Sequence, residues 1–75
     1  MDKITVTNML DAGCSAIVRS TPFCINELRN MAKSALRTSA TLTIVIEDNL
    51  TAKDIELITA EAPRNIKLDF TRCDF

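Results

Sequence analysis

Cys24 is the residue whose type and position most readily suggest chemistry. It occupies the place at a predicted helix start that Thr5 and Thr51 occupy at two others. A thiol at a helix N-terminus can ionise more easily than a free thiol and so become a better nucleophile. However, the chain has no histidine to act as its base, and Arg19 and Arg29 are the nearby cations in sequence. We therefore expect a packed thiol at Cys24, and a thiol-dependent activity centred on it is the alternative.

Several carboxylates could in principle supply acid and base catalysis. Such a pair must converge in a cleft where the two pKa values are driven apart. Glu47 and Asp48 follow a predicted strand, whereas Asp54, Glu56 and Glu61 lie on a predicted helix. Acids in these positions are usually solvated and complement the helix dipole. We predict that they are structural and not catalytic.

The sequence contains no motif that is typical of a metal, cofactor or phosphate site. Cys14, Cys24 and Cys73 are odd in number and widely spaced, with no histidine beside them, so they outline neither a zinc site nor a disulfide framework. The single glycine, Gly13, cannot supply a phosphate-binding loop, which needs several residues without Cβ. We expect free thiols in small apolar positions, no metal, no cofactor and no enzymatic activity.

Composition predicts one small globular domain over residues 1–75, with 47% apolar and 25% charged residues. The net charge is −1 and the charges are interspersed, which disfavours nucleic acid and anionic membrane as partners. The first residues lack the apolar run of a signal peptide, and no stretch is long enough to span a bilayer. We expect a cytoplasmic protein.

Capping signals and apolar periodicity predict an alternating order of helices and strands. Thr51 and Asp54 form a capping box, Pro22 suits a first helical turn, and Gly13 lies where a left-handed residue can end a helix. Three- and four-residue apolar steps mark the helices, and period-two alternation marks the strands. The predicted helices cover 5–12, 21–36 and 51–62, and the predicted strands cover 15–19, 41–47 and 65–70.

Strands joined through helices pair in parallel, with right-handed crossovers that place the helices on one face of the sheet. The chain is therefore predicted to be an α/β protein of three αβ units, with a three-stranded parallel sheet and helices on one face. Leu42, Ile44 and Ile46 are predicted to face the helices, whereas the facing of 15–19 stays open because a one-residue slip exchanges the two faces. The opposite face mixes apolar and charged side chains. Its predicted binding surface is Val45, Glu47, Lys67 and Asp69.

The strand-to-helix junctions carry a recurring phrase. Residues 68–75, Leu68-x-Phe70-x-x-Cys73-x-Phe75, and residues 16–23, Ala16-x-Val18-x-x-Thr21-x-Phe23, resemble the leucine-rich-repeat phrase L-x-L-x-x-[N/C]-x-L. A third alignment, through Thr43 and Val45, conflicts with the alternation that turns these two residues away from the helices. The resemblance implies a short α/β solenoid whose open sheet face binds another macromolecule, without catalytic residues.

Two alternatives to a complete solenoid stay open at this point. Any small βαβ-type domain needs capped helices after its strands, so the phrase can also arise in a compact α/β domain that is repetitive only in shape. The chain can also be a piece of a longer repeat array, because Phe75 falls where a further unit would begin. In each case we expect a non-enzymatic module that binds another protein or a copy of itself.

Overall fold

The computed structural model describes residues 3–71 and contains three helices that alternate with three strands. The predicted mixed α/β class is confirmed. Cys73 and Phe75, which the sequence analysis singled out, lie outside the described residues. In chain order the elements are α1 (Lys3–Asp11), β1 (Ala16–Arg19), α2 (Ile25–Thr38), β2 (Leu42–Val45), α3 (Ala52–Glu61) and β3 (Ile66–Asp69).

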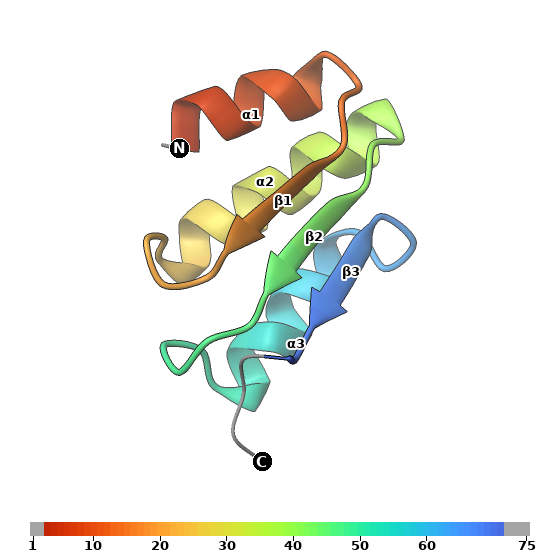
Figure 1. Cartoon of the computed structure of the whole chain (residues 1–75). Coiled ribbons are helices and arrows are strands. Elements are labelled where there is room, and N and C mark those ends of the chain that lie inside the picture. The colour runs from red at the N-terminus through yellow and green to blue at the C-terminus, as the bar shows by residue number, and fades with distance from the viewer. Residues whose placement is uncertain (1–2, 72–75) are drawn as a thin grey trace.

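The three strands form a parallel sheet in the order β1-β2-β3, with the helices in a single layer behind it (Figure 1). Ala16 pairs with Leu42 and Leu42 with Ile66, so equivalent positions of the three units lie in rows across the sheet. Because neighbouring strands are also consecutive in sequence, each unit contacts only the next one. This arrangement is what a short solenoid requires, and the solenoid itself stays a prediction.

The core lies between the sheet and the helix layer. Even-numbered strand residues point into it: Leu42 and Ile44 are completely buried, and Ala16 and Val18 are nearly so. Helix residues three or four positions apart share one face of the helix, and they pack against these strand side chains from the other side. The helix side chains that fill the core are Val6, Leu10, Leu28, Met31, Ala32, Ala35 and Ile58.

Two predicted helix starts are wrong. α1 begins at Lys3, so Thr5 lies inside its first turn and does not cap it. α2 begins at Ile25 and not near residue 21, because the preceding residues form a turn in which the Phe23 N–H donates to the Ser20 carbonyl at 3.1 Å. That turn buries Phe23 in the core. Pro22 therefore belongs to the loop before the helix.

The central strand is shorter than predicted, because β2 ends at Val45 and not at residue 47. The Ile46 N–H still donates to the Asp69 carbonyl at 2.8 Å, but the next N–H, that of Glu47, donates to the Ser20 hydroxyl at 2.8 Å. A side chain of the neighbouring unit thus replaces the backbone partner that would have continued the strand.

Helices α1 and α2 end in the same hydrogen-bonded motif. Gly13 has a φ of 85°, its N–H donates to Leu10, and the Cys14 N–H donates to Met9, which together make a Schellman motif. The predicted role of Gly13 is confirmed. Ser39 takes the equivalent place after α2 with a φ of 60°, so this helix ends at Thr38 and not at residue 36 as predicted.

Thr51 caps α3 as predicted. The Asp54 N–H donates to the Thr51 hydroxyl at 3.2 Å, and the Thr51 N–H donates to the Asp54 carboxylate at 3.1 Å. We expect Thr51→Ala to lower the free energy of unfolding by about 1 kcal/mol, because the Asp54 N–H loses its acceptor. Urea titration followed by far-UV circular dichroism measures this change. Thr51→Ser, which keeps the oxygen, should retain most of the stability, and equal losses in the two variants would contradict the capping role.

Candidate binding surface

The sheet face turned away from the helices carries the candidate binding surface. Side chains here come from the odd-numbered strand residues and lie in two rows across the sheet. One row contains Ile17, Thr43 and Lys67, and the other contains Arg19, Val45 and Asp69. These six residues are called the open face below, and Figure 1 views the sheet from this side.

The structure brings three of the four predicted surface residues together. Val45 and Asp69 are paired neighbours in one row, and Lys67 lies in the adjacent row. Glu47 follows β2 and lies at the border of this face, where its side chain is only 16% exposed. Its carboxylate is already occupied, since it binds Thr21 and Arg19.

Ile17 is the surface residue that sequence reasoning missed. Its side chain is 70% exposed on the open face, next to Thr43. The sequence left the facing of this strand open, because four residues with an apolar centre can be turned either way. The leucine-rich-repeat phrase could have indicated the side of Ile17. Its first two leucine positions, which would face inward, fall on Ala16 and Val18, and both residues are buried.

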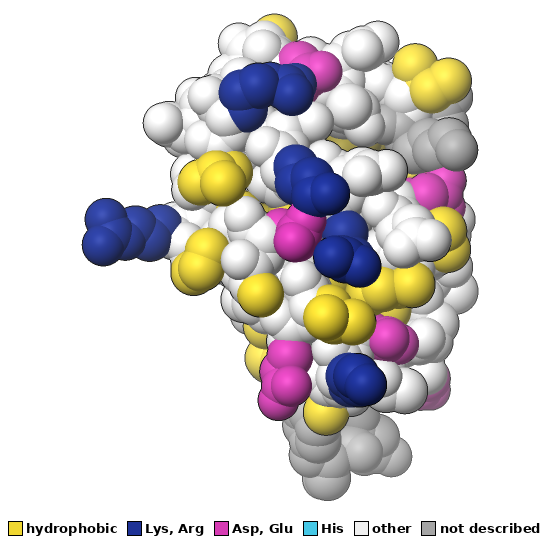
Figure 2. All heavy atoms as spheres, turned by 180° about the vertical axis from the view of Figure 1, so that it is seen from behind, with side chains coloured by type: hydrophobic (Ala, Val, Ile, Leu, Met, Phe, Trp, Pro, Cys, Tyr) yellow, Lys and Arg dark blue, Asp and Glu magenta, His cyan; other side chains and the backbone are white. Residues whose placement is uncertain are grey.

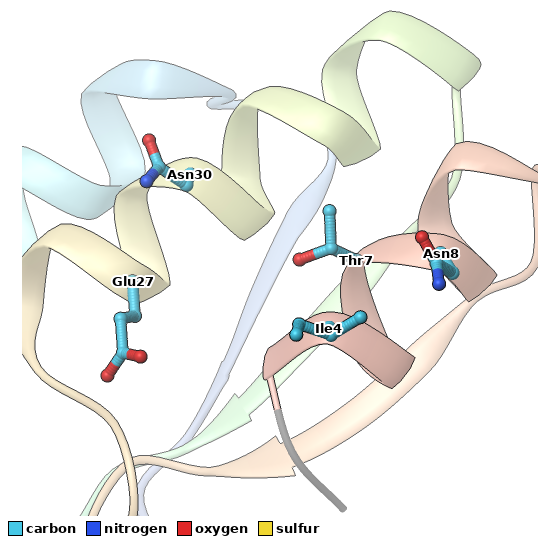
Figure 3. A pocket seen from close by; sticks show the side chains of 5 residues that line it. All are labelled: Ile4, Thr7, Asn8, Glu27 and Asn30. Atoms are coloured by element: carbon cyan, nitrogen blue, oxygen red, sulfur yellow. The ribbon is translucent and has the colours of Figure 1, made fainter.

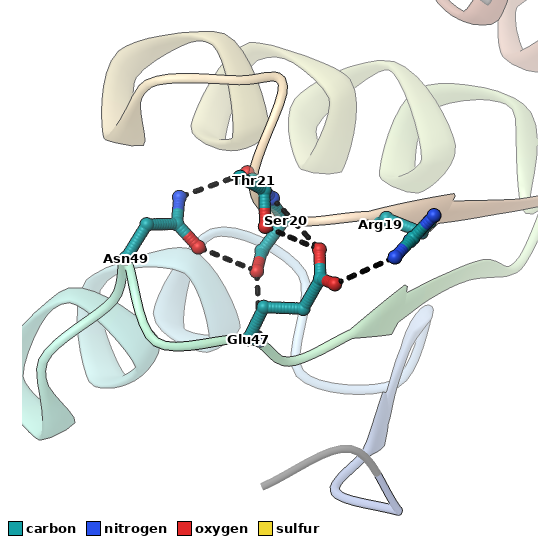
Figure 4. Close-up of polar contacts among 5 residues, drawn as sticks. All are labelled: Arg19, Ser20, Thr21, Glu47 and Asn49. Atoms are coloured by element: carbon teal, nitrogen blue, oxygen red, sulfur yellow. Dashed lines mark hydrogen bonds and ion pairs between the residues drawn. The ribbon is translucent and has the colours of Figure 1, made fainter.

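A cluster of hydrogen bonds lies at the carboxyl edge of the sheet, where β1 and β2 end (Figure 4). Ser20 is completely buried, and its hydroxyl donates to Asn49 Oδ1 at 2.7 Å and accepts the Glu47 N–H. The Asn49 amide donates to the carbonyls of Ser20 at 2.9 Å and Phe23 at 3.4 Å. These contacts join the loops of two successive units.

Glu47 completes this cluster on its solvent side (Figure 4). One carboxylate oxygen accepts from the Thr21 hydroxyl and N–H, and the other binds the Arg19 guanidinium at 3.0 Å. The Thr21 hydroxyl is the main cause of a lowered Glu47 pKa, with further contributions from the Thr21 N–H and from Arg19. These contacts favour the ionised carboxylate, and desolvation opposes them in part.

The edge cluster resembles an active site in composition, but its geometry is structural. Ser20 is closed off from solvent and both hydrogen-bonding roles of its hydroxyl are used inside the protein. In open α/β sheets, ligands bind where the strand order reverses and neighbouring loops separate. The order β1-β2-β3 contains no reversal, so this rule indicates no ligand site at the edge cluster.

Cys24 lies at the N-cap of α2, as its position predicted, but it is exposed. The expectation of a packed thiol is wrong, and it is wrong for Cys14 as well. Glu27 accounts for the position of Cys24, because its carboxylate accepts the Cys24 N–H at 3.0 Å. Arg19 and Arg29, the neighbouring cations in sequence, form ion pairs with Glu47 and Glu61.

A groove of about 360 Å³ lies between α1 and the first half of α2 (Figure 3). Its described lining consists of Ile4, Thr7, Asn8, Glu27 and Asn30. Glu27 is its one ionisable member, and that carboxylate caps α2. Within residues 3–71, no cluster of His, Cys, Asp and Glu side chains could hold a metal ion. Besides this carboxylate, the described lining offers two amides, a hydroxyl and an apolar side chain.

Several charged residues of the helix layer pair across neighbouring helices, and blue and magenta side chains lie side by side on this face (Figure 2). Lys33 on α2 binds Glu61 on α3 at 3.2 Å, and Arg29 binds the same carboxylate at 3.6 Å. On the other side of α2, Arg37 binds Asp11 of α1. Arg29, Lys33 and Arg37 thus join α2 to the helices on both of its sides.

Comparison with known proteins gives no family for this chain, because no family model, curated protein or solved structure matches it. Within residues 3–71, no helix is both long and apolar enough to cross a bilayer.

The Glu47 contacts predict a specific pH dependence of stability. Because its pKa in the folded protein lies below the ordinary value of 4.5, the ionised carboxylate stabilises the fold above that pH. This stabilisation is lost as the pH falls through the folded-state pKa. We therefore expect Glu47→Gln to be less stable than the wild-type protein at pH 7, with a difference that shrinks in acid.

Denaturant titrations between pH 2.5 and pH 7, a range that spans the ordinary carboxyl pKa, measure this difference. Glu56→Gln is the matched control, since it removes the same charge from an exposed position on α3. Equal pH profiles for the two variants would contradict a stabilising role for the Glu47 carboxylate.

Proposed function

We propose that this protein is a non-enzymatic binding module that uses the open face and the adjoining edge of β1 to bind another protein or a second copy of itself. The observation that carries the proposal is Ile17, a large apolar side chain that is 70% exposed in the middle of an edge strand. Together with half-buried Val45 it adds apolar surface to a face that also carries Arg19, Lys67 and Asp69. Apolar side chains among charged ones are typical of protein contact surfaces.

The single layer of helices supports the same surface. A parallel sheet normally has both faces covered, yet here the helices cover one face only. A domain of 75 residues has a small core, so covering the second face brings it a relatively large gain in buried apolar area. The resemblance to leucine-rich repeats also favours the open face, and a cytoplasmic location belongs to this proposal.

Several basic side chains of the helix layer are already paired. Three of its basic side chains, Arg29, Lys33 and Arg37, already contact acids of the neighbouring helices. A partner would have to compete with these intramolecular pairs. Arg19 is likewise paired, with Glu47, and its side chain is 58% exposed, close to the 60% of Lys33 and the 65% of Arg37. The proposal therefore depends on the apolar side chains of the open face and not on its charges.

The thiol alternative is supported only by the exposure of Cys24 at the start of α2. Alkylation at neutral pH tests it, because a reactive thiol would be modified much faster than Cys14, which is also exposed. Similar rates at the two positions would leave protein binding as the function.

We expect Val45→Lys to weaken association more than folding, since it places a charge where a partner buries an apolar side chain. The cost in folding should be at most about 1 kcal/mol, the usual range for a half-buried strand position. Sedimentation equilibrium measures self-association, and affinity capture from an extract of the native cells, with the bound protein identified and its binding remeasured in pure form, measures a foreign partner.

Leu36→Lys is the matched control, because Leu36 is an apolar residue on α2 with 51% of its surface exposed. Charge reversal at Lys33 or Arg37 extends the control to the ion pairs of the helix layer. If these helix variants abolish binding while Val45→Lys associates as before, the helix layer is the contact surface and the proposal is wrong.

A further inference from the structure

The outer edge of β1 presents backbone groups to a new strand. The N–H groups of Ala16 and Ser20 donate to carbonyls of the β2 segment, each at 3.0 Å. Since successive residues of a strand alternate in the direction of their N–H and C=O groups, Ile17 and Arg19 point theirs the other way. Among residues 3–71 no strand lies on that side, because β1 is the outermost strand of the sheet.

This edge is short and carries one charged side chain, Arg19, but it lacks several other features that keep strand edges apart. Proteins protect exposed edges with proline, lysine, inward-pointing charges or bulges. β1 has the sequence Ala-Ile-Val-Arg, its inward residues Ala16 and Val18 are apolar and buried, and its centre is an exposed isoleucine. On the opposite edge of the sheet, β3 carries Lys67 and Asp69 on its open face.

The helix beside β1 adds further apolar surface to the same flank. Thr7 and Asp11 face α2, since Thr7 lines the groove between the helices and Asp11 binds Arg37. At 100° per residue, Met9 lies about 200° around the helix from both of them. Met9, which is 38% exposed, therefore lies on the flank away from α2. Ile17 and Met9 are thus two exposed apolar residues on the outer side of the first unit, away from the second unit.

From these observations we propose that the β1 edge pairs with β1 of a second copy, antiparallel and about a two-fold axis at Ile17. The result is a continuous six-stranded sheet in which Ile17 lies opposite Ile17 of the second copy. This inference rests on the proposed function, because it names the partner as another molecule of the same chain and places the contact at the edge of the open face.

The edge is self-complementary in this register. Ile17 donates to and accepts from its counterpart, Arg19 pairs with Ser15 of the second copy, and Ala16 lies opposite Val18 of the second copy. Like charges are never directly opposed, which is the arrangement that destabilises cross-strand pairs. Each Arg19 also retains its own Glu47. A two-fold interface of this kind is the commonest route to a homodimer.

A small apolar groove lies where the second copy would pass. It has a volume of about 210 Å³ and is lined by Ile17, Val18, Arg19, Pro22 and Phe23, at the carboxyl end of β1. In the proposed register, the segment that precedes β1 in the second copy runs along this groove. The contact spans a short strand and one helix flank, so it is smaller than a standard interface. We therefore expect a dimer that dissociates on dilution.

Sedimentation equilibrium of the full chain across micromolar to millimolar concentrations tests the dimer, with Ile17→Pro and Ile17→Ala as a matched pair. Both variants lose the isoleucine side chain, but only proline loses the outward N–H, and proline is tolerated on a strand edge that faces solvent. We expect Ile17→Pro to raise the dimer dissociation constant at least about tenfold, and by more than Ile17→Ala. Far-UV circular dichroism checks that the variants are folded, and Ile17→Lys replaces Ile17→Pro if the latter unfolds.

Disulfide trapping tests the register. In a chain with Cys14, Cys24 and Cys73 changed to serine, Ile17→Cys places two thiols on directly opposed residues, about 5.5 Å apart between Cα atoms. That spacing permits a disulfide, so mild oxidation should give a covalent dimer. Arg19→Cys is the control, because its two copies would lie four residues apart along the strands, roughly 13 Å, and should not cross-link.

The outcomes separate this inference from the proposed function. A protein that stays monomeric at millimolar concentration but binds a foreign protein in a Val45-dependent manner overturns the dimer and keeps the function. Growth beyond a dimer, or a dimer unaffected by every Ile17 variant, overturns the β1 pairing. A dimer that is lost in Ile17→Pro and trapped by Ile17→Cys supports the inference, even if Val45→Lys associates normally and the open face proves not to bind.

Discussion

The rest of the fold depends on the backbone pairing of β2, the one strand in residues 3–71 that is hydrogen-bonded on both sides. This pairing sets the register in which Val18, Ile44 and Leu68 all turn toward the helices. A shift of one residue would move the apolar set of any strand to the solvent side. Both ends of β2 are tied to neighbouring units, through Leu42 to Asn65 at 2.8 Å and through Glu47 to Ser20. The register is therefore fixed by specific bonds and by burial.

Two asparagine side chains strengthen this arrangement, one at the carboxyl ends of the strands and one at their amino ends. Asn49 donates to backbone carbonyls of the loop after β1, and Asn65 donates to the Ala40 carbonyl of the loop before β2 at 2.9 Å. In each case a side chain satisfies carbonyls of the preceding unit that have no ladder partner. The units are consequently held together by side-chain amides at both ends of the strands. A hydrogen bond from the Thr38 hydroxyl to the Leu10 carbonyl also joins α2 to α1. The same constraint thus applies at both junctions between units: the backbone carbonyls of a loop need hydrogen-bond donors from the adjacent unit.

The element order and the parallel sheet could be predicted because their signals are local. Thr51, Asp54 and Gly13 mark helix ends through contacts with near neighbours in sequence. The errors arose where a distant residue decides the outcome. β2 stops early because Ser20, 27 residues away, takes the Glu47 N–H. Of the candidate surface, Val45, Lys67 and Asp69 followed from strand alternation, whereas Ile17 needed the pairing of β1 with β2 to fix its side.

The edge cluster also shapes the surface that a partner would meet. In the register of β1 and β2, Ser20 of the first unit lies beside Ile46 of the second. Ser20 is therefore a polar residue at a completely buried position. Burying a hydroxyl is costly unless it is hydrogen-bonded, and here Asn49 and the Glu47 N–H meet that need. The same contacts fix Glu47, and Glu47 in turn binds the guanidinium of Arg19 at the border of the open face. Buried hydrogen bonds thereby hold a surface charge in place before any partner arrives. A side chain already ordered in the free protein loses less conformational entropy on binding, so under the proposed function the interior of the edge cluster would favour recognition at the surface.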